Sequence, residues 1–218
     1  MEDIFLNQYL NSIKETIKSH KNIYIFFKTL KNFFGATSYI FQRFKLQSQN
    51  NQLMLGFSGK LSSWVTFDII PGADYLGSIK DLSLFSSNSM NRIYASHVLE
   101  HINSKDAEIA LQEMYRVLKP KGELFIVVPD LLVLSQFLET EFSQTAIDIM
   151  YGVNRPLNDW NPQHQYGYTK TSLRELLLKT KFTEIEEFEP FINDTSRFRL
   201  QDTPISLCLK ARKLEPHL

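Results

Sequence analysis

The sequence contains one cysteine, Cys208, and this scarcity excludes a fold that depends on a disulfide framework. It also argues against a zinc site built from cysteines. The neighbours Leu207 and Leu209 suggest a strand, in which side-chain alternation would place Cys208 on the opposite face from both. No activating partner is evident, so we expect a half-buried and unreactive thiol.

Net charge and long apolar runs are also absent. Lysine plus arginine and aspartate plus glutamate number 24 each, so the overall charge indicates no particular partner. No stretch approaches the roughly 20 uninterrupted apolar residues of a membrane span. The first residues are polar and acidic, unlike a signal peptide. With 43% hydrophobic and 22% charged residues, the 218-residue chain is typical of a globular protein, which we expect in the cytoplasm.

Acidic residues are missing from a long segment near the amino terminus. Between Thr16 and Phe67 there is no aspartate or glutamate, whereas basic and aromatic residues are frequent. The spacing of apolar residues predicts a helical extension over residues 1–50, followed by a main domain at 51–218. Three interpretations of residues 1–45 remain open. They form a helical cap with solvated lysines, a surface that contacts anionic lipid or an anionic carrier, or, least favoured, a nucleic-acid surface without a recognised module.

A strand, a helix and a second strand are predicted in the middle of the chain. Arg92–Ala95 alternates polar and apolar residues as in a short strand. Asn103 or Ser104 can cap a helix whose apolar residues recur at helical spacing. Leu124–Val128 is a continuous apolar run, typical of a parallel strand buried on both faces. Such a unit is right-handed and predicts an α/β fold.

Ligands in open sheets of this kind bind outside the carboxyl ends of the strands. One such end is visible at Ser96-His97. Earlier in the chain, an apolar strand runs into the turn Gly56–Gly59, and the next strand carries Asp68 near its carboxyl end. An acid placed after a glycine turn is the arrangement that binds ribose hydroxyls. Here the separation in sequence between the glycine turn and Asp68 is shorter than the roughly 20 residues usual in dinucleotide sites.

Taken in this order, the segments resemble those of a class I S-adenosylmethionine-dependent methyltransferase. The matching segments are LMLGFSG at 53–59, Asp68, SHVLEH at 96–101, RVLKPKG at 116–122 and HQYGY at 164–168. The resemblance covers about residues 53–212. It implies a Rossmann-like sheet of seven strands, mostly parallel with an antiparallel last strand. Phe182–Phe191 and Ile205–Lys210 would supply the terminal strand pair.

The resemblance also implies S-adenosylmethionine as the cofactor and a set of residues that hold it. The implied cofactor-binding residues are Gly56, Phe57, Ser58 and Gly59 beside the methionine moiety, Asp68 at the ribose hydroxyls, Ile69, Asp81 and Leu82 at the adenine, and Ser96 near the transferable methyl group. His97 would border the methyl group and the substrate.

Methyl transfer requires alignment and desolvation more than a dedicated set of catalytic groups. A general base helps a hydroxyl acceptor and is less necessary for a preformed anion. His164 is the first candidate base, because it lies in a polar and aromatic loop. His97 is the second candidate, although at the predicted mouth of the site a role in lining the pocket is favoured over proton transfer. Glu100 and His101 are interpreted as a structural link. Metal binding by these two residues with the remote His164 is the less favoured alternative, and we expect no metal site.

We therefore expect a methyltransferase that acts on a small-molecule or saccharide-type acceptor. Phe57 and Ser58 stand where the family usually has a small residue and a second glycine. This difference motivates a second hypothesis, a catalytically inactive binding module of the same fold. A third hypothesis is a membrane-surface or carrier-docking protein that acts through its basic, aromatic amino terminus. Neither the acceptor nor the oligomeric state follows from the sequence.

Overall fold

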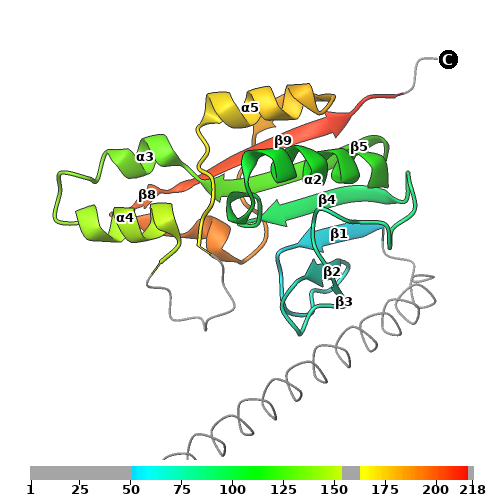
Figure 1. The fold of residues 1–218 in the computed structure, drawn as a ribbon, viewed down its shortest axis with the longest axis horizontal. Coiled ribbons are helices and arrows are strands. Elements are labelled where there is room, and N and C mark those ends of the chain that lie inside the picture. Colours follow the sequence, from blue (N-terminus) through cyan, green and yellow to red (C-terminus); the bar gives the residue numbers. More distant parts are fainter. Residues whose placement is uncertain (1–50, 154–162, 216–218) are drawn as a thin grey trace, which may run out of the picture. The chain divides into compact units, whose positions relative to one another are not determined.

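A computed structural model describes residues 51–153 and 163–215, which belong to one unit, Gln49–Leu218 (Figure 1). The predicted helical extension over residues 1–50 lies outside the described residues. So do the hypotheses of lipid, carrier and nucleic-acid contact that rest on it. Within the described ranges, no helix is both long enough and apolar enough to cross a membrane.

A seven-stranded sheet organises the described residues, in the order β3-β2-β1-β4-β5-β9-β6. The strands are β1 (Gln52–Leu55), β2 (Val65–Asp68), β3 (Tyr75–Leu76), β4 (Met90–Ser96), β5 (Leu118–Pro129), β6 (Phe182–Glu187) and β9 (Ser206–Lys213). Strands β1 to β5 pair in parallel, and β9 runs antiparallel to both β5 and β6. This arrangement confirms the predicted α/β fold, including the antiparallel last strand.

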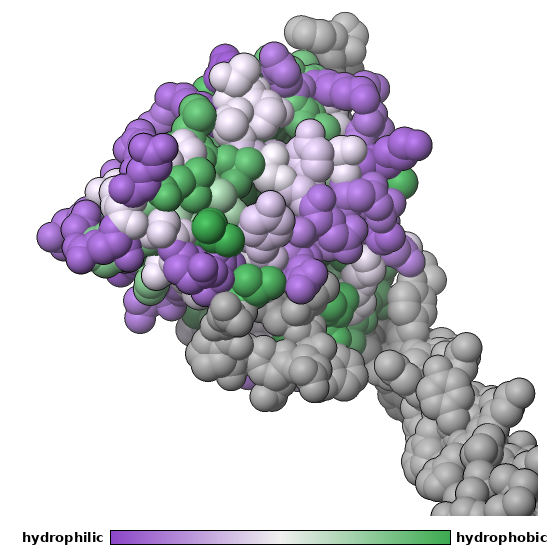
Figure 2. Space-filling view, turned by 60° about the vertical axis from the view of Figure 1, so that its left-hand side comes forward, coloured by the Kyte–Doolittle hydropathy of each residue, from purple (hydrophilic) through white to green (hydrophobic). Residues whose placement is uncertain are grey.

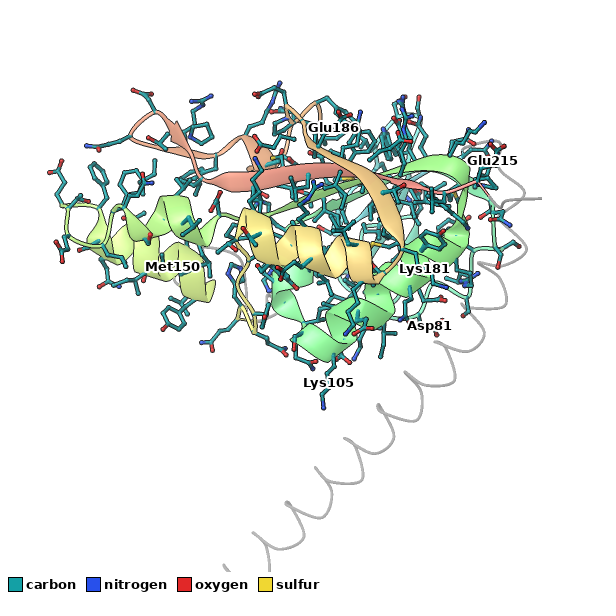
Figure 3. The ribbon with its side chains drawn as sticks, turned by 90° about the horizontal axis from the view of Figure 1, so that it is seen from above. Asp81, Lys105, Met150, Lys181, Glu186 and Glu215 are labelled. Atoms are coloured by element: carbon teal, nitrogen blue, oxygen red, sulfur yellow. The ribbon has the colours of Figure 1, made fainter. Side chains whose placement is uncertain are left out.

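Helices α2 (Ser104–Val117) and α5 (Lys170–Lys179) lie side by side on one face of the sheet (Figures 1 and 3). Helix α2 begins where the sequence predicts, and both helices are capped by side chains. The Asn103 side chain accepts the N–H groups of the first turn of α2, and Thr169 forms a capping box with Ser172 at α5. These caps satisfy backbone donors that the helix itself leaves unpaired, and so they fix where each helix starts.

Two shorter helices, α3 (Leu131–Ser135) and α4 (Ser143–Tyr151), follow the carboxyl end of β5 (Figure 1). Asp130 caps α3 by accepting the N–H groups of Leu132 and Val133. Single-turn helices η1 (Leu99–His101) and η2 (Thr195–Arg197) and a small ribbon of β7 (Arg199–Leu200) and β8 (Thr203–Pro204) complete the described elements. The helices α3 and α4 therefore lie at the edge where the parallel strands end.

Aromatic side chains pack on the face of the sheet opposite α2 and α5. Tyr94 of β4 lies at the centre of this cluster and makes ring contacts with Trp64, Phe125 and Phe188. Residues 56–64 connect β1 to β2 without a helix, although parallel strands are usually joined by a dozen or more residues. The missing helix explains why the glycine turn and Asp68 are so close in sequence.

Cys208 of β9 belongs to this aromatic cluster, and its thiol is buried. Burial raises the pKa of the thiol to about 12, so almost none of it is ionised near neutral pH. We expect Cys208 to react with a thiol reagent at pH 8 at least roughly 100-fold more slowly than a free cysteine. Denaturant should restore rapid reaction. Fast, stoichiometric labelling of the folded protein would contradict the burial of Cys208.

Candidate functional site

The strand register places three predicted cofactor residues at one level of the sheet. Leu55 of β1 pairs with Phe67 of β2 on one side and with Ala95 of β4 on the other. The residues that follow these three are Gly56, Asp68 and Ser96. They therefore stand next to one another where three adjacent parallel strands end, which is the edge at which such sheets bind ligands.

Gly56 has a left-handed backbone, with φ of +79°, and donates its N–H to the carbonyl of Phe67 at 3.0 Å. A Cβ atom at this position would lie 2.0 Å from Cγ1 of Val98 and 2.8 Å from the carbonyl oxygen of Ser96. Both the conformation and the space therefore require glycine. The loop that follows β4 packs directly against the end of β1 because no side chain separates them.

Gly56→Ala is expected to destabilise the protein by about 3 kcal/mol, because left-handed strain and overpacking act together. Gly59→Ala in the same turn is the matched control. Its Cβ would meet only the ring of Phe57, and its φ is not positive, so we expect a change within about 1 kcal/mol. Denaturant unfolding of both variants measures the difference. Equal effects would contradict a specific requirement at Gly56.

Phe57 and Ser58 take positions that the chain tolerates without strain. Phe57 is partly buried and packs against the aromatic cluster of the sheet. Ser58 does not have a positive φ, so its Cβ carries no left-handed penalty. Its carbonyl oxygen would lie 2.2 Å from a Cβ placed on Gly72. The loops after β1 and β2 thus touch at Gly72, and the second glycine of this site comes from the neighbouring loop.

Asp68 forms a local turn in which Oδ1 accepts the N–H of Ile70 at 3.1 Å. Burial raises the pKa of its carboxyl, and the backbone hydrogen bonds from Ile70 and Ile69 and the charge of His101 offset this only in part. The side chain of Ile69 is 54% exposed and offers an apolar surface beside the carboxylate. A carboxylate next to an open apolar surface suits a ribose joined to an aromatic base.

Asp81 and Leu82, both predicted to lie near an adenine, have different environments. Hydrogen bonds from the side chain and the backbone N–H of Ser83 lower the pKa of the Asp81 carboxyl. Leu82 is fully buried, and its N–H donates to Glu113 of α2 at 2.9 Å. The Glu113 carboxylate in turn pairs with Arg116. This placement favours a core role for Leu82, whereas Asp81 remains a predicted contact.

Ser96 ends β4 with its hydroxyl buried and without a hydrogen-bond partner among residues 51–153 and 163–215. His97 follows in a left-handed conformation, with φ of +50°. Its Nδ1 lies 3.0 Å from Oε1 of Glu100, and its Nε2 lies 3.3 Å from Oγ of Ser206. A carboxylate therefore orients the imidazole, and its second nitrogen faces the carboxyl end of β5.

Glu100 is the centre of a histidine cluster that the sequence did not predict. Its carboxylate is 1% exposed, and His97, His101 and His164 surround it. Burial raises the pKa of the carboxyl, but the hydrogen bond from His97 and the charges of the three histidines outweigh burial, so the pKa is lowered. The proximity of Glu100 to His97 and His101 was readable from the sequence, but that of His164 was not.

His164, the first candidate base, is placed in this cluster with its side chain only 3% exposed. Its Nδ1 lies 3.1 Å from the carbonyl oxygen of Met150 in α4, so this nitrogen carries the proton and donates. Met150 is labelled in Figure 3. Nε2 of His164 lies 3.9 Å from Oε1 of Glu100, and the His164 ring packs edge-on against the ring of His101. This environment favours a buried side chain that is held in one orientation over a base that reaches a substrate.

A pocket of about 520 Å³ lies at the other edge of the sheet, where β1 and β4 begin. It is lined by Asn51, Gln52, Ser63, Asn91, Arg92, Lys121 and Glu123. None of the predicted site residues borders it. Ligands of such sheets bind at the carboxyl ends of the strands. The predicted site residues Gly56, Asp68 and Ser96 lie at those ends, and the pocket lies at the opposite ends.

Comparison with known proteins agrees with this fold. Residues 60–126 match a family model described as a methyltransferase domain. A Thermotoga maritima protein described as a SAM-dependent methyltransferase, possible histamine N-methyltransferase, superposes with a TM-score of 0.52. It is 16% identical over 81% of this chain and 88% of its own. No curated protein sequence matches the chain.

Two further structures are similar at lower TM-scores. The CurJ carbon methyltransferase has a TM-score of 0.49 at 15% identity, over 78% of this chain and 50% of its own length. A Burkholderia thailandensis 1,6-didemethyltoxoflavin-N1-methyltransferase has a TM-score of 0.46 at 12% identity, over 83% of this chain and 78% of that one. The fold is that of the class I S-adenosylmethionine-dependent methyltransferases, and residues 60–126 are similar to the methyltransferase domain model.

Proposed function

We propose that the protein is an enzyme that transfers the methyl group of S-adenosylmethionine to a small-molecule acceptor. The observation that carries this proposal is the alignment of Gly56, Asp68 and Ser96 at the carboxyl ends of three adjacent strands. The match of residues 60–126 to the methyltransferase domain family supports it. This match includes Asp68 and Ser96.

The residues at this edge fit the cofactor. The Asp68 carboxylate would accept the ribose hydroxyls, and the exposed side chain of Ile69 would cover one face of the adenine. The Ser96 hydroxyl is buried without a partner in the described part of the chain and would gain one from the bound ligand. When bound, the cofactor supplies an electrophilic methyl group on a sulfonium. The chain itself supplies alignment and the exclusion of water.

The acceptor would bind beyond the ends of β4 and β5, next to α3 and α4. This end of the molecule carries apolar side chains among polar ones (Figure 2). Its exposed large side chains are Leu132, Leu138, Ile147, Tyr151 and Tyr166. Exposed tyrosines combine a flat apolar ring with a hydroxyl, which suits a saccharide-type acceptor or another small ring.

His97 is the residue that we propose as the general base for a hydroxyl acceptor. Glu100 holds its Nδ1, so the imidazole keeps Nε2 available as the accepting nitrogen. The imidazole follows Ser96 directly, and Nε2 faces Ser206 at the start of β9. Glu100 is then a positioning residue, which acts on the reaction through His97. The sequence favours His164 as the general base. Because the His164 imidazole is buried against Met150 and Glu100, we propose His97 for this role instead.

Isothermal titration calorimetry with S-adenosylmethionine and S-adenosylhomocysteine tests the enzyme proposal. We expect one saturable site, followed by transfer of radiolabelled methyl to at least one compound in a panel of small hydroxylated and saccharide acceptors. The absence of binding at millimolar cofactor would overturn the proposal. Saturable binding of both ligands without transfer to any acceptor class would favour the inactive binding module of the same fold.

A further inference from the structure

Glu100, His101 and His164 converge on one point from segments that lie far apart in the chain. Glu100 and His101 belong to η1, directly after β4, and His164 follows α4. The nitrogen and oxygen atoms that these three side chains offer to a metal ion all lie within 4.8 Å of one another. Buried groups of this kind in contact with one another need a physical explanation.

Two atoms of this cluster are buried without a hydrogen-bond partner in residues 51–153 and 163–215. They are Oε2 of Glu100 and Nδ1 of His101. A buried acceptor left unpaired costs about 1–3 kcal/mol, and more when the group is charged. Oε1 of the same carboxylate is held by His97, so the carboxylate is fixed with its second oxygen free to bind. A cation between Glu100 and His101 would satisfy both unpaired atoms.

Hydrogen bonds around the cluster orient the His164 imidazole and the Glu100 carboxylate as metal ligands. Nδ1 of His164 donates to the Met150 carbonyl, and Nε2 is the nitrogen that faces Glu100; the neutral imidazole with its proton on Nδ1 coordinates a metal through Nε2. A backbone carbonyl on the far nitrogen of a ligating histidine is a recurrent feature of metal sites. His97 likewise orients the Glu100 carboxylate through the hydrogen bond from its Nδ1 to Oε1. Glu100 and His164 are therefore held in position before any ion binds.

We propose that Glu100, His101 and His164 bind a divalent transition-metal ion, for which zinc is the best match. Two imidazole nitrogens and one carboxylate oxygen form a known zinc ligand set, with a fourth position left for water. Calcium and magnesium prefer oxygen ligands alone. Bonds of about 2.0–2.1 Å in a tetrahedral site put the ligand atoms roughly 3.4 Å apart. The three side chains must therefore close inward from their present separations.

The proposed ion would connect the loop after β4 to the segment after α4, which are also joined where Gln165 and Tyr166 donate backbone N–H groups to the Glu100 carbonyl. It would lie beside the imidazole of His97 without contacting Nε2. The site thus stabilises the edge at which the methyltransferase residues lie. Metal binding does not require cofactor binding, so this proposal and the proposed function can be overturned separately.

A cobalt titration of the full-length, tag-free protein, first stripped with a chelator, tests the site. We expect one cobalt ion per chain, visible as ligand-field absorption, and zinc competition with a chromogenic chelator should give a Kd below about 1 μM. His101→Ala and His164→Ala should each weaken binding by at least roughly 100-fold, because each removes a ligand. Glu186→Gln, an exposed carboxylate that pairs with Lys210, should leave binding unchanged.

Wild-type protein alone can overturn the proposal, whatever the variants do. No saturable binding at about 100 μM cobalt or zinc would exclude the site. Thermal unfolding provides a second measurement, because a ligand that binds only the folded state raises Tm. We expect zinc to raise the Tm of the wild type and not that of His164→Ala. Retained tight binding in both histidine variants would place the ion elsewhere and refute this assignment.

Discussion

Asp68→Asn is expected to weaken the binding of S-adenosylhomocysteine about 100-fold. This factor corresponds to about 2.7 kcal/mol, and hydrogen bonds to a charged group contribute about 1.5–3 kcal/mol each. Asparagine keeps the side-chain oxygen that accepts the N–H of Ile70, so the local turn is preserved. The loss is therefore attributable to the missing charge at the ribose hydroxyls. Calorimetric titration measures it directly.

The same substitution should make the folded protein slightly more stable near neutral pH. The pKa of Asp68 is raised by burial, so folding favours its protonated form and disfavours the ionised one. This cost is absent below the ordinary pKa near 3.8. It develops as the pH rises toward the raised folded-state pKa. Asp68→Asn should therefore have a higher Tm than wild type at pH 7, and the difference should shrink below pH 4.

Asp106→Asn is the matched control for both measurements. Asp106 lies in the first turn of α2 and pairs with Lys80, and it is not one of the predicted cofactor-binding residues. We expect its affinity for S-adenosylhomocysteine to stay within about twofold of wild type. An Asp68 variant that binds as tightly as wild type would show that this carboxylate does not hold the ribose.

His97→Gln is expected to lower kcat about 100-fold with a hydroxyl acceptor, since a positioned general base contributes about 10²–10⁴-fold. The affinity for S-adenosylhomocysteine should change little, because His97 lies on the acceptor side of Ser96. The measurement compares kcat with the calorimetric Kd of the same variant. A parallel loss in both quantities would indicate that His97 supports the local fold instead of moving a proton.

Ser206→Ala separates these two roles for His97. Ser206 is the polar partner of Nε2, at 3.3 Å, and removing its hydroxyl leaves the imidazole and its bond to Glu100 in place. We expect kcat to stay within about fivefold of wild type. Glu100→Gln, by contrast, should lower kcat toward the level of His97→Gln, because the neutral amide lacks the charge that stabilises the imidazolium formed when His97 takes up a proton. Wild-type activity in Glu100→Gln would remove it as a positioning residue.

Phe57 and Ser58 motivate the hypothesis of an inactive binding module. The structure shows that neither residue strains the turn after β1. Ser58 adopts an ordinary backbone conformation, and the close approach in this region occurs at Gly72. The ring of Phe57 packs into the aromatic cluster of the sheet. The unusual turn is thus accommodated within a shortened connection between β1 and β2.

The sequence by itself determined most strand segments of the sheet, the start of α2 and the strand ends at which a ligand is expected. These features depend on local signals. Apolar runs mark buried strands, and Asn103 and Thr169 cap their helices whatever the rest of the chain does. The family resemblance added the strand order, which no local pattern contains. Sequence spacing also revealed that the glycine turn and Asp68 are unusually close.

Only the tertiary structure decided which residues of the edge contact one another. The register of β1 with β2 and β4 brings Gly56, Asp68 and Ser96 to one level, and register depends on pairing across the whole sheet. Leu82, whose contact with adenine stays a prediction, has its backbone N–H and carbonyl hydrogen-bonded to Glu113 and Arg116 of a later helix. His164 joins Glu100 and His101 because α3 and α4 carry the chain back to η1. Long-range contacts of this kind leave no local pattern in the sequence.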